Sequence, residues 1–113
     1  MIKATFERDG SGRIHSYKIT GHADFSESGS DIVCAAVSAV AISTVNGIDA
    51  LAKVQLVIDS DEKKGGYLKV EVPQDITQRQ VDISQILLEN LLLAIQSICL
   101  QYEDYIQFET INS

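Results

Sequence analysis

Cys34 and His22 are the residues whose types and spacing could support nucleophilic catalysis. Both lie in the stretch GHADFSESGSDIVCAAVS, residues 21–38, in which a polar segment leads into an apolar run that begins just before Cys34. A cysteine attacks a carbonyl as the thiolate, and a helix N-terminus with a nearby imidazole lowers the pKa of a thiol. The pair therefore predicts acyl transfer, with Cys34 as nucleophile and His22 as its base.

A predicted helix from Asp31 places Asp31, Cys34 and Ser38 along one stripe, because each residue advances about 100° around the axis. Ser30 or Asp31 is suited to cap this helix, so that unpaired backbone N–H groups surround Cys34 and favour a thiolate or an oxyanion. Asp31 could instead serve as a cap alone. Ser38 could simply donate a hydrogen bond to the carbonyl one turn back.

Each candidate also has a purely structural interpretation. Cys34 could be a small buried apolar residue among alanines, and His22 a surface loop residue. His15 belongs to a strand pattern and Cys99 to a leucine-rich helix, so both are assigned to structure. The cysteine and histidine spacings match no zinc signature, and phosphate-loop and dinucleotide fingerprints are absent, so we expect no metal and no cofactor.

The elements that must position these residues follow from periodicity. Alternating residues 2–8 and 13–20 predict a hairpin around residues 9–12, with His15, Tyr17 and Ile19 on one face of the second strand and Ile14 on the other. Residues 22–30 show neither period and predict a loop. Helical spacing then runs from Asp31, with a kink at residues 46–47, through residue 51.

The second half of the chain also contains a predicted hairpin and a predicted helix, although the two halves share no sequence repeat. Residues 54–59 and 67–72 predict a second hairpin around a charged turn, a helix starts at Asp82 or Ser84 and reaches Tyr102, and residues 105–111 form a last strand. The order ββαββαβ predicts an α+β fold, a small mixed or antiparallel sheet packed with two main helices. The broad apolar surface of the second helix predicts a homodimer.

Composition limits the classes of function. With 113 residues and 45% hydrophobic residues, the chain is expected to form one domain, residues 1–113. A net charge of −7 argues against direct binding of nucleic acid. We expect no signal peptide and no membrane span, hence a cytoplasmic protein in which Cys34 and Cys99 form no disulfide.

The run Gly21-His22-Ala23, then Gly29, then Asp31-Ile32-Val33-Cys34-Ala35-Ala36-Val37-Ser38 resembles the signature of the ribosomal-processing cysteine proteases, the Prp family. The similarity extends over the whole chain in length and element order. The resemblance implies a homodimeric α+β protease that removes the N-terminal extension of the large-subunit ribosomal protein L-twenty-seven, after a pair of phenylalanines.

Carried over by position, the resemblance implies that Cys34 is the nucleophile and His22 its base. Gly21, Gly29, Asp31 and Ser38 would support the site, and an apolar pocket near the loop would accept an aromatic side chain, with Phe25 contributing. The main alternative is a non-catalytic, ribosome-associated binding module in which Cys34 only packs. A redox-sensing thiol is a third interpretation and lacks a nearby resolving cysteine.

Overall fold

The computed structural model describes residues 1–21, 30–61 and 66–112, the first two residues of helix α1 by their backbone alone. The elements, in chain order, are β1 (Ile2–Arg8), β2 (Ile14–Thr20), α1 (Ser30–Gly47), the wider π-helical turns η1 (Ile48–Ala52), β3 (Val57–Ser60), β4 (Tyr67–Glu71), α2 (Gln78–Gln101) and β5 (Ile106–Asn112). This order confirms the predicted α+β succession ββαββαβ.

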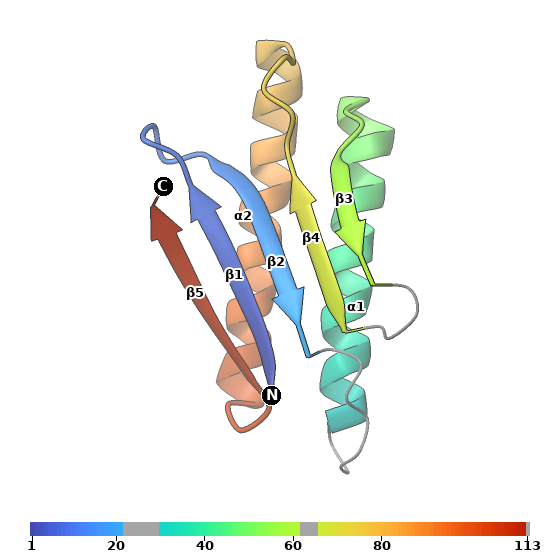
Figure 1. Ribbon diagram of the computed structural model, residues 1–113, viewed down its shortest axis with the longest axis vertical. Coiled ribbons are helices and arrows are strands. Elements are labelled where there is room, and N and C mark those ends of the chain that lie inside the picture. Colours follow the sequence, from blue (N-terminus) through green and yellow to red (C-terminus); the bar gives the residue numbers. More distant parts are fainter. Residues whose placement is uncertain (22–29, 62–65, 113) are drawn as a thin grey trace.

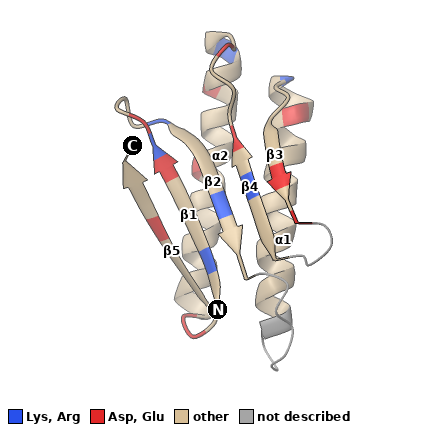
Figure 2. Ribbon diagram, in the orientation of Figure 1, with Lys and Arg blue, Asp and Glu red and all other residues tan. Residues whose placement is uncertain are grey.

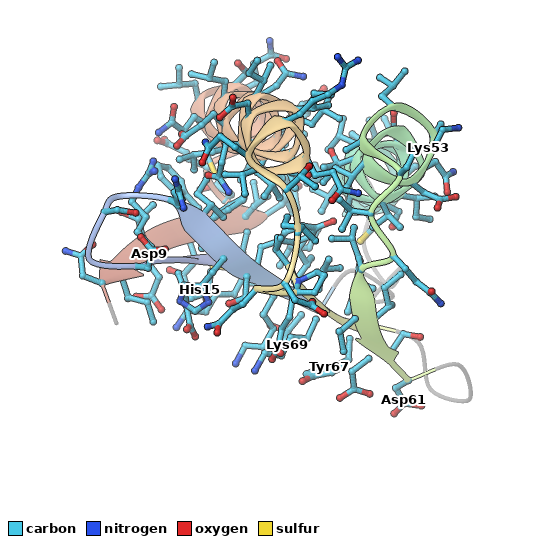
Figure 3. The ribbon with its side chains drawn as sticks, turned by 90° about the horizontal axis from the view of Figure 1, so that it is seen from above. Asp9, His15, Lys53, Asp61, Tyr67 and Lys69 are labelled. Atoms are coloured by element: carbon cyan, nitrogen blue, oxygen red, sulfur yellow. The ribbon has the colours of Figure 1, made fainter. Side chains whose placement is uncertain are left out.

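The strands form one mixed sheet in the order β3-β4-β2-β1-β5, in which β5 runs parallel to β1 and the other neighbours are antiparallel. Both long helices cover the same face of this sheet, as Figures 1 and 3 show. The opposite face carries ion pairs between strand residues, including Lys3 with Glu109 at 3.4 Å and Lys69 with Glu71 at 3.2 Å. The sheet is therefore apolar on the helix side and polar on the open side.

The core lies between the sheet and the helices. Phe6 and Tyr17 are neighbours on β1 and β2, with ring centroids 5.9 Å apart, and both are buried. The Tyr17 hydroxyl donates a hydrogen bond of 3.2 Å to the backbone carbonyl of Ala41 in α1. This bond ties the central strand to the middle of the helix that carries Cys34.

A β-bulge corrects the predicted faces of β2. The register between β1 and β2 shifts between Glu7 and Arg8, so that Ile14 joins Tyr17 in the core. His15 lies instead on the open face (Figure 3), with its Nε2 3.6 Å from a Glu7 carboxylate oxygen. The predicted strand is therefore confirmed, but the faces predicted for Ile14 and His15 are wrong because of the bulge.

Two predicted boundaries are wrong. Helix α2 begins at Gln78 instead of Asp82 or Ser84, because Thr77 and Gln80 form a reciprocal capping box. Strand β3 begins only at residue 57. Val54 and Leu56 precede the strand and are buried in the hydrophobic core.

Candidate active site

Cys34 is the fifth residue of α1. Its side chain is 0% exposed and belongs to the hydrophobic core. The helix begins at Ser30, so its first backbone N–H groups, which have no partner within the helix, lie about one turn from the thiol. Cys34 is therefore buried, as its structural interpretation expects. It also lies near the helix start, where a helix stabilises negative charge.

Gly21 directly follows β2 and has a backbone conformation that glycine favours. Its φ is +80°, and its backbone N–H donates a hydrogen bond of 2.8 Å to the carbonyl of Gly66. A Cβ atom placed on Gly21 would overlap the carbonyl oxygen of Met1. The direction in which the chain leaves β2 is therefore set by three backbone segments that meet at Gly21.

The other predicted site residues lie largely outside the described residues. His22, Phe25 and Gly29 are in residues 22–29, and only the backbone of Asp31, in the first turn of α1, is described. Gly21 and Ser30, which bound this segment, are fixed by β2 and α1 respectively.

Ser38 lies one turn beyond Cys34 on α1, about 6 Å along the axis. It lines a pocket of about 270 Å³ between α1 and the sheet, which we call the α1–β4 pocket. Apolar side chains dominate its wall, among them Ile19, Val37, Ala41, Ile42 and Leu68. The resemblance implied an apolar pocket near the loop of residues 22–30 without naming its wall, and residues 19, 41, 42 and 68 are lining residues that sequence patterning did not single out.

The second cysteine and histidine occupy different surroundings. Cys99 is half-buried at the edge of the core, and burial raises the pKa of its thiol. His15 lies at the opposite end of β2 from Gly21, about 20 Å along the strand. The structural roles predicted for Cys99 and His15 are consistent with these positions. Within residues 1–21, 30–61 and 66–112, no three side chains of the metal-ligating types cluster.

A helix that carries a buried cysteine near its start, next to an apolar pocket, suits covalent attack on a peptide carbonyl. The model of the family described as cysteine protease Prp matches residues 1–107. The chain belongs to the cysteine protease Prp family. This membership favours the protease over the binding module.

Curated members of the family cover nearly the whole chain. The ribosomal processing cysteine protease Prp of Bacillus subtilis (strain 168) is 36% identical over 110 residues, covering 97% of each chain. The Staphylococcus aureus (strain NCTC 8325 / PS 47) protein of the same name is 31% identical over 107 residues, covering 95% of this chain and 96% of its own.

Several solved structures share the fold. The crystal structure of SMU.848 from Streptococcus mutans superposes with a TM-score of 0.89 at 35% identity, covering 100% of this chain and 96% of its own. The essential ribosomal processing protease Prp from S. aureus in complex with a substrate peptide gives 0.86 at 29%, covering 97% and 99%. Its complex with a covalently linked product peptide gives 0.82 at 30%, with the same coverage. The chain is therefore an α+β cysteine protease.

Proposed function

We propose that this chain is a cytoplasmic endopeptidase that removes the N-terminal extension of ribosomal protein L-twenty-seven during ribosome assembly. The family membership carries this proposal, since the Prp relatives are ribosomal processing proteases and cover 95% or more of the chain. A relative whose complex holds a substrate peptide supports a peptide as the partner. The net charge of −7 suits a basic ribosomal precursor better than nucleic acid.

In the mechanism we propose, His22 takes the proton from the Cys34 thiol, and the thiolate attacks the scissile carbonyl carbon. Backbone N–H groups in the first turn of α1 donate hydrogen bonds to the oxyanion. As the C–N bond breaks, His22 protonates the leaving amine and a thioester to Cys34 remains. Water then attacks this thioester with His22 as base, which releases the extension and restores the thiol. The covalently linked product peptide in the S. aureus relative supports such an acyl-enzyme.

The α1–β4 pocket supports the preference for an aromatic residue before the cut. Its apolar wall begins one helical turn from Cys34, so an apolar side chain next to the scissile carbonyl can occupy it. Ser38, which lines the pocket, is the proposed polar contact of the substrate. Phe25 is proposed to complete the aromatic subsite.

The remaining site residues have supporting roles in this proposal. Gly21 and Gly29 would set the chain direction on either side of the segment that carries His22. Asp31 would stabilise the start of α1 through its charge near the positive end of the helix dipole. Replacing Asp31 by alanine is expected to lower stability by about 0.5–1 kcal/mol and to leave the pH profile of cleavage unchanged.

The exposed apolar surface of the helix layer supports a homodimer as the active assembly. Leu93 and Leu100 of α2 are 61% and 86% exposed, and exposed apolar side chains that form a contiguous patch mark protein–protein contacts. We therefore propose that the protease acts as two identical subunits.

The chain contains its own matched controls for the catalytic pair, because it has two cysteines and two histidines. A peptide that spans the extension is incubated with wild type, Cys34→Ala, Cys99→Ala, His22→Ala and His15→Ala, and the products are identified by mass spectrometry. We expect cleavage after the phenylalanine pair to be lost in the Cys34 and His22 variants only. Undiminished cleavage by Cys34→Ala would contradict the mechanism. A peptide that stays intact with a wild-type protein whose Cys34 still reacts with an active-site label, such as a peptide chloromethyl ketone, would contradict the proposed substrate.

A further inference from the structure

Two pockets follow one another along helix α1. The α1–β4 pocket takes its helical wall from residues 37–42, and a second pocket of about 240 Å³ takes its helical wall from residues in the range 45–49, where α1 passes into η1. We call the second one the α1–β3 pocket. Strand β3 contributes to both, with Ser60 in the first and Ile58 in the second. Cys34 precedes both pockets on the helix, so the order along the axis is the thiol, the α1–β4 pocket and the α1–β3 pocket.

Strand β3 forms one edge of the sheet (Figure 1). Among the described strands it pairs only with β4. All four of its residues are exposed, and Val57 and Ile58 are 56% and 48% exposed. In an antiparallel pair, every second residue directs its backbone N–H and C=O away from the partner strand. The outer side of β3 therefore presents hydrogen-bonding groups with which an added strand can pair.

The spacing of the two pockets matches that of an extended peptide. Ile58 and Ser60 are two residues apart on β3, which corresponds to about 6.6 Å along the strand. On the helix, Ile42 of the first pocket and Asn46 of the second are one turn apart, about 6 Å along the axis. Side chains two residues apart on an extended chain point to the same face at this same spacing. A peptide that lies along β3 can therefore place one side chain in each pocket.

The surroundings of the α1–β3 pocket are acidic. Residues 30–61 contain four Asp and one Lys, and Figure 2 shows acidic residues on β3 and on the helix behind it. The polar residues that line the pocket are Asn46, Asp49 and Gln55. Within the part of the chain that the structure describes, none of these three side chains has a hydrogen-bond or ion-pair partner. They are therefore available to a side chain that donates hydrogen bonds, above all a lysine or arginine beside the Asp49 carboxylate.

Helix α1 and strand β3 run in opposite directions along these pockets (Figure 1). On the helix the residue numbers rise from the α1–β4 pocket to the α1–β3 pocket, whereas on β3 they fall from Ser60 to Ile58. The proposed cut lies at Cys34, before the α1–β4 pocket, and the aromatic residues precede the cut in the substrate. Residues further before the cut therefore reach Ile58, and the peptide runs parallel to β3, as β5 runs parallel to β1.

From these relationships we propose that the substrate binds as a strand added parallel to the free edge of β3. The first residue before the cut occupies the α1–β4 pocket, and the third residue before the cut occupies the α1–β3 pocket. The inference rests on the protease function proposed above and adds a second subsite, whose chemistry favours lysine or arginine. Ile58 and Val45 contact the carbon chain of that side chain, and Asp49 its charged end. The occupant is the part of the substrate that the cut removes.

Exchanging charges between peptide and protein tests the second subsite. Two peptides with a phenylalanine pair before the cut are compared, one with lysine and one with glutamate as the third residue before the cut. Their kcat/KM is measured for wild type, Asp49→Lys and Asp75→Lys. Asp75 is exposed and does not line the α1–β3 pocket, so its replacement makes the same change of net charge elsewhere. We expect wild type and Asp75→Lys to prefer the lysine peptide about fivefold, and Asp49→Lys to prefer the glutamate peptide.

The contrary results of this comparison separate the subsite from the protease. A preference for lysine that Asp49→Lys retains, or no preference in wild type, would overturn the second subsite and leave the protease function intact. If wild type cleaves neither peptide although its Cys34 still reacts with a peptide chloromethyl ketone, the proposed substrate is wrong and the inference falls with it.

Backbone methylation of the peptide tests the added strand. Of two neighbouring residues in a parallel pair, one directs its N–H towards the partner strand and the other directs it away. The lysine peptide is compared with versions that carry an N-methyl group on the third or on the fourth residue before the cut. Cleavage by wild type should fall about tenfold for one of the two and stay nearly unchanged for the other.

Equal cleavage of the two methylated peptides would overturn strand addition. If Ile58→Lys then also converted a dimer into a monomer in light scattering, the edge of β3 would belong to a second copy of the chain instead of the substrate.

Discussion

The carbonyl of Met1 occupies the space that a side chain on Gly21 would need. The carbonyl carbon of Met1 is 3.2 Å from the position of such a Cβ, and the Cα of Ile2 is 3.4 Å from it. Gly21 therefore brings the start of β1 to the residue immediately before His22. The N-terminal backbone thus lies against Gly21, the residue that precedes the proposed catalytic base in the sequence.

Replacing Gly21 by alanine is expected to destabilise the protein and to impair cleavage. The positive φ costs about 1–2 kcal/mol for a residue with a side chain, and displacing the Met1 backbone adds about 1–3 kcal/mol. Urea unfolding measures the stability, and peptide cleavage at a temperature where both proteins are folded measures kcat.

Gly12→Ala is the matched control for that experiment. Gly12 has a φ of +88° and open space around its Cβ position, so its replacement carries the conformational cost without the clash. We expect Gly12→Ala to lose about 1–2 kcal/mol and to keep full kcat. Equal losses of stability and activity in the two variants would show that the contact with Met1 is unimportant.

Tyr17→Phe tests the bond between the sheet and α1. Removing the hydroxyl that donates to the Ala41 carbonyl is expected to lower the free energy of unfolding by about 0.5–1.5 kcal/mol at neutral pH. Burial raises the pKa of Tyr17 far above its usual value of about 10. The folded protein therefore keeps a proton that the unfolded chain releases above about pH 10.

That proton predicts an alkaline difference between the two proteins. The stability of wild type should fall as the pH rises above about 10, whereas Tyr17→Phe lacks this contribution. The difference in free energy of unfolding should therefore shrink or reverse between pH 9 and pH 11. A difference that stays constant across this range would show that Tyr17 ionises freely in the folded state.

Ser38→Leu tests the α1–β4 pocket. Ser38 lines this pocket of about 270 Å³, and the larger leucine side chain would occupy part of its space. We expect the variant to cleave a peptide with phenylalanine before the cut at least about tenfold less efficiently, which corresponds to about 1.4 kcal/mol. A peptide with alanine at that position is the control and should lose less. An equal loss for both peptides would place the aromatic subsite elsewhere.

Much of the fold could be predicted because its signals are local. Alternation located β1, β2, β4 and β5, and the apolar run from Ile32 located α1. The early start of α2 also had a local signal, the Thr77-x-x-Gln80 capping box. This signal was missed because the residues before Asp82 show only weak apolar periodicity. The bulge beside His15 had none, because it depends on the register against β1.

The candidate site also has parts that local sequence predicts and parts that depend on contacts between distant segments. Cys34 and Ser38 could be placed on one helix from their spacing alone. The pocket could not, because Ile19 and Leu68 reach it from strands that are distant in sequence and pair only in the folded sheet. The contact of Met1 with Gly21 likewise joins residues whose proximity is created by β1 and β2 pairing.

The most direct test of the account is to label the nucleophile with a peptide chloromethyl ketone ending in phenylalanine, followed by peptide mapping. A thioether should form between the Cys34 sulfur and the methylene carbon of the label, with loss of chloride and one equivalent of label bound. The rate of labelling should fall strongly in His22→Ala. Cys99, whose pKa is raised by burial, should stay unmodified. Loss of activity with the label on Cys99, or on neither cysteine, would contradict Cys34 as the nucleophile.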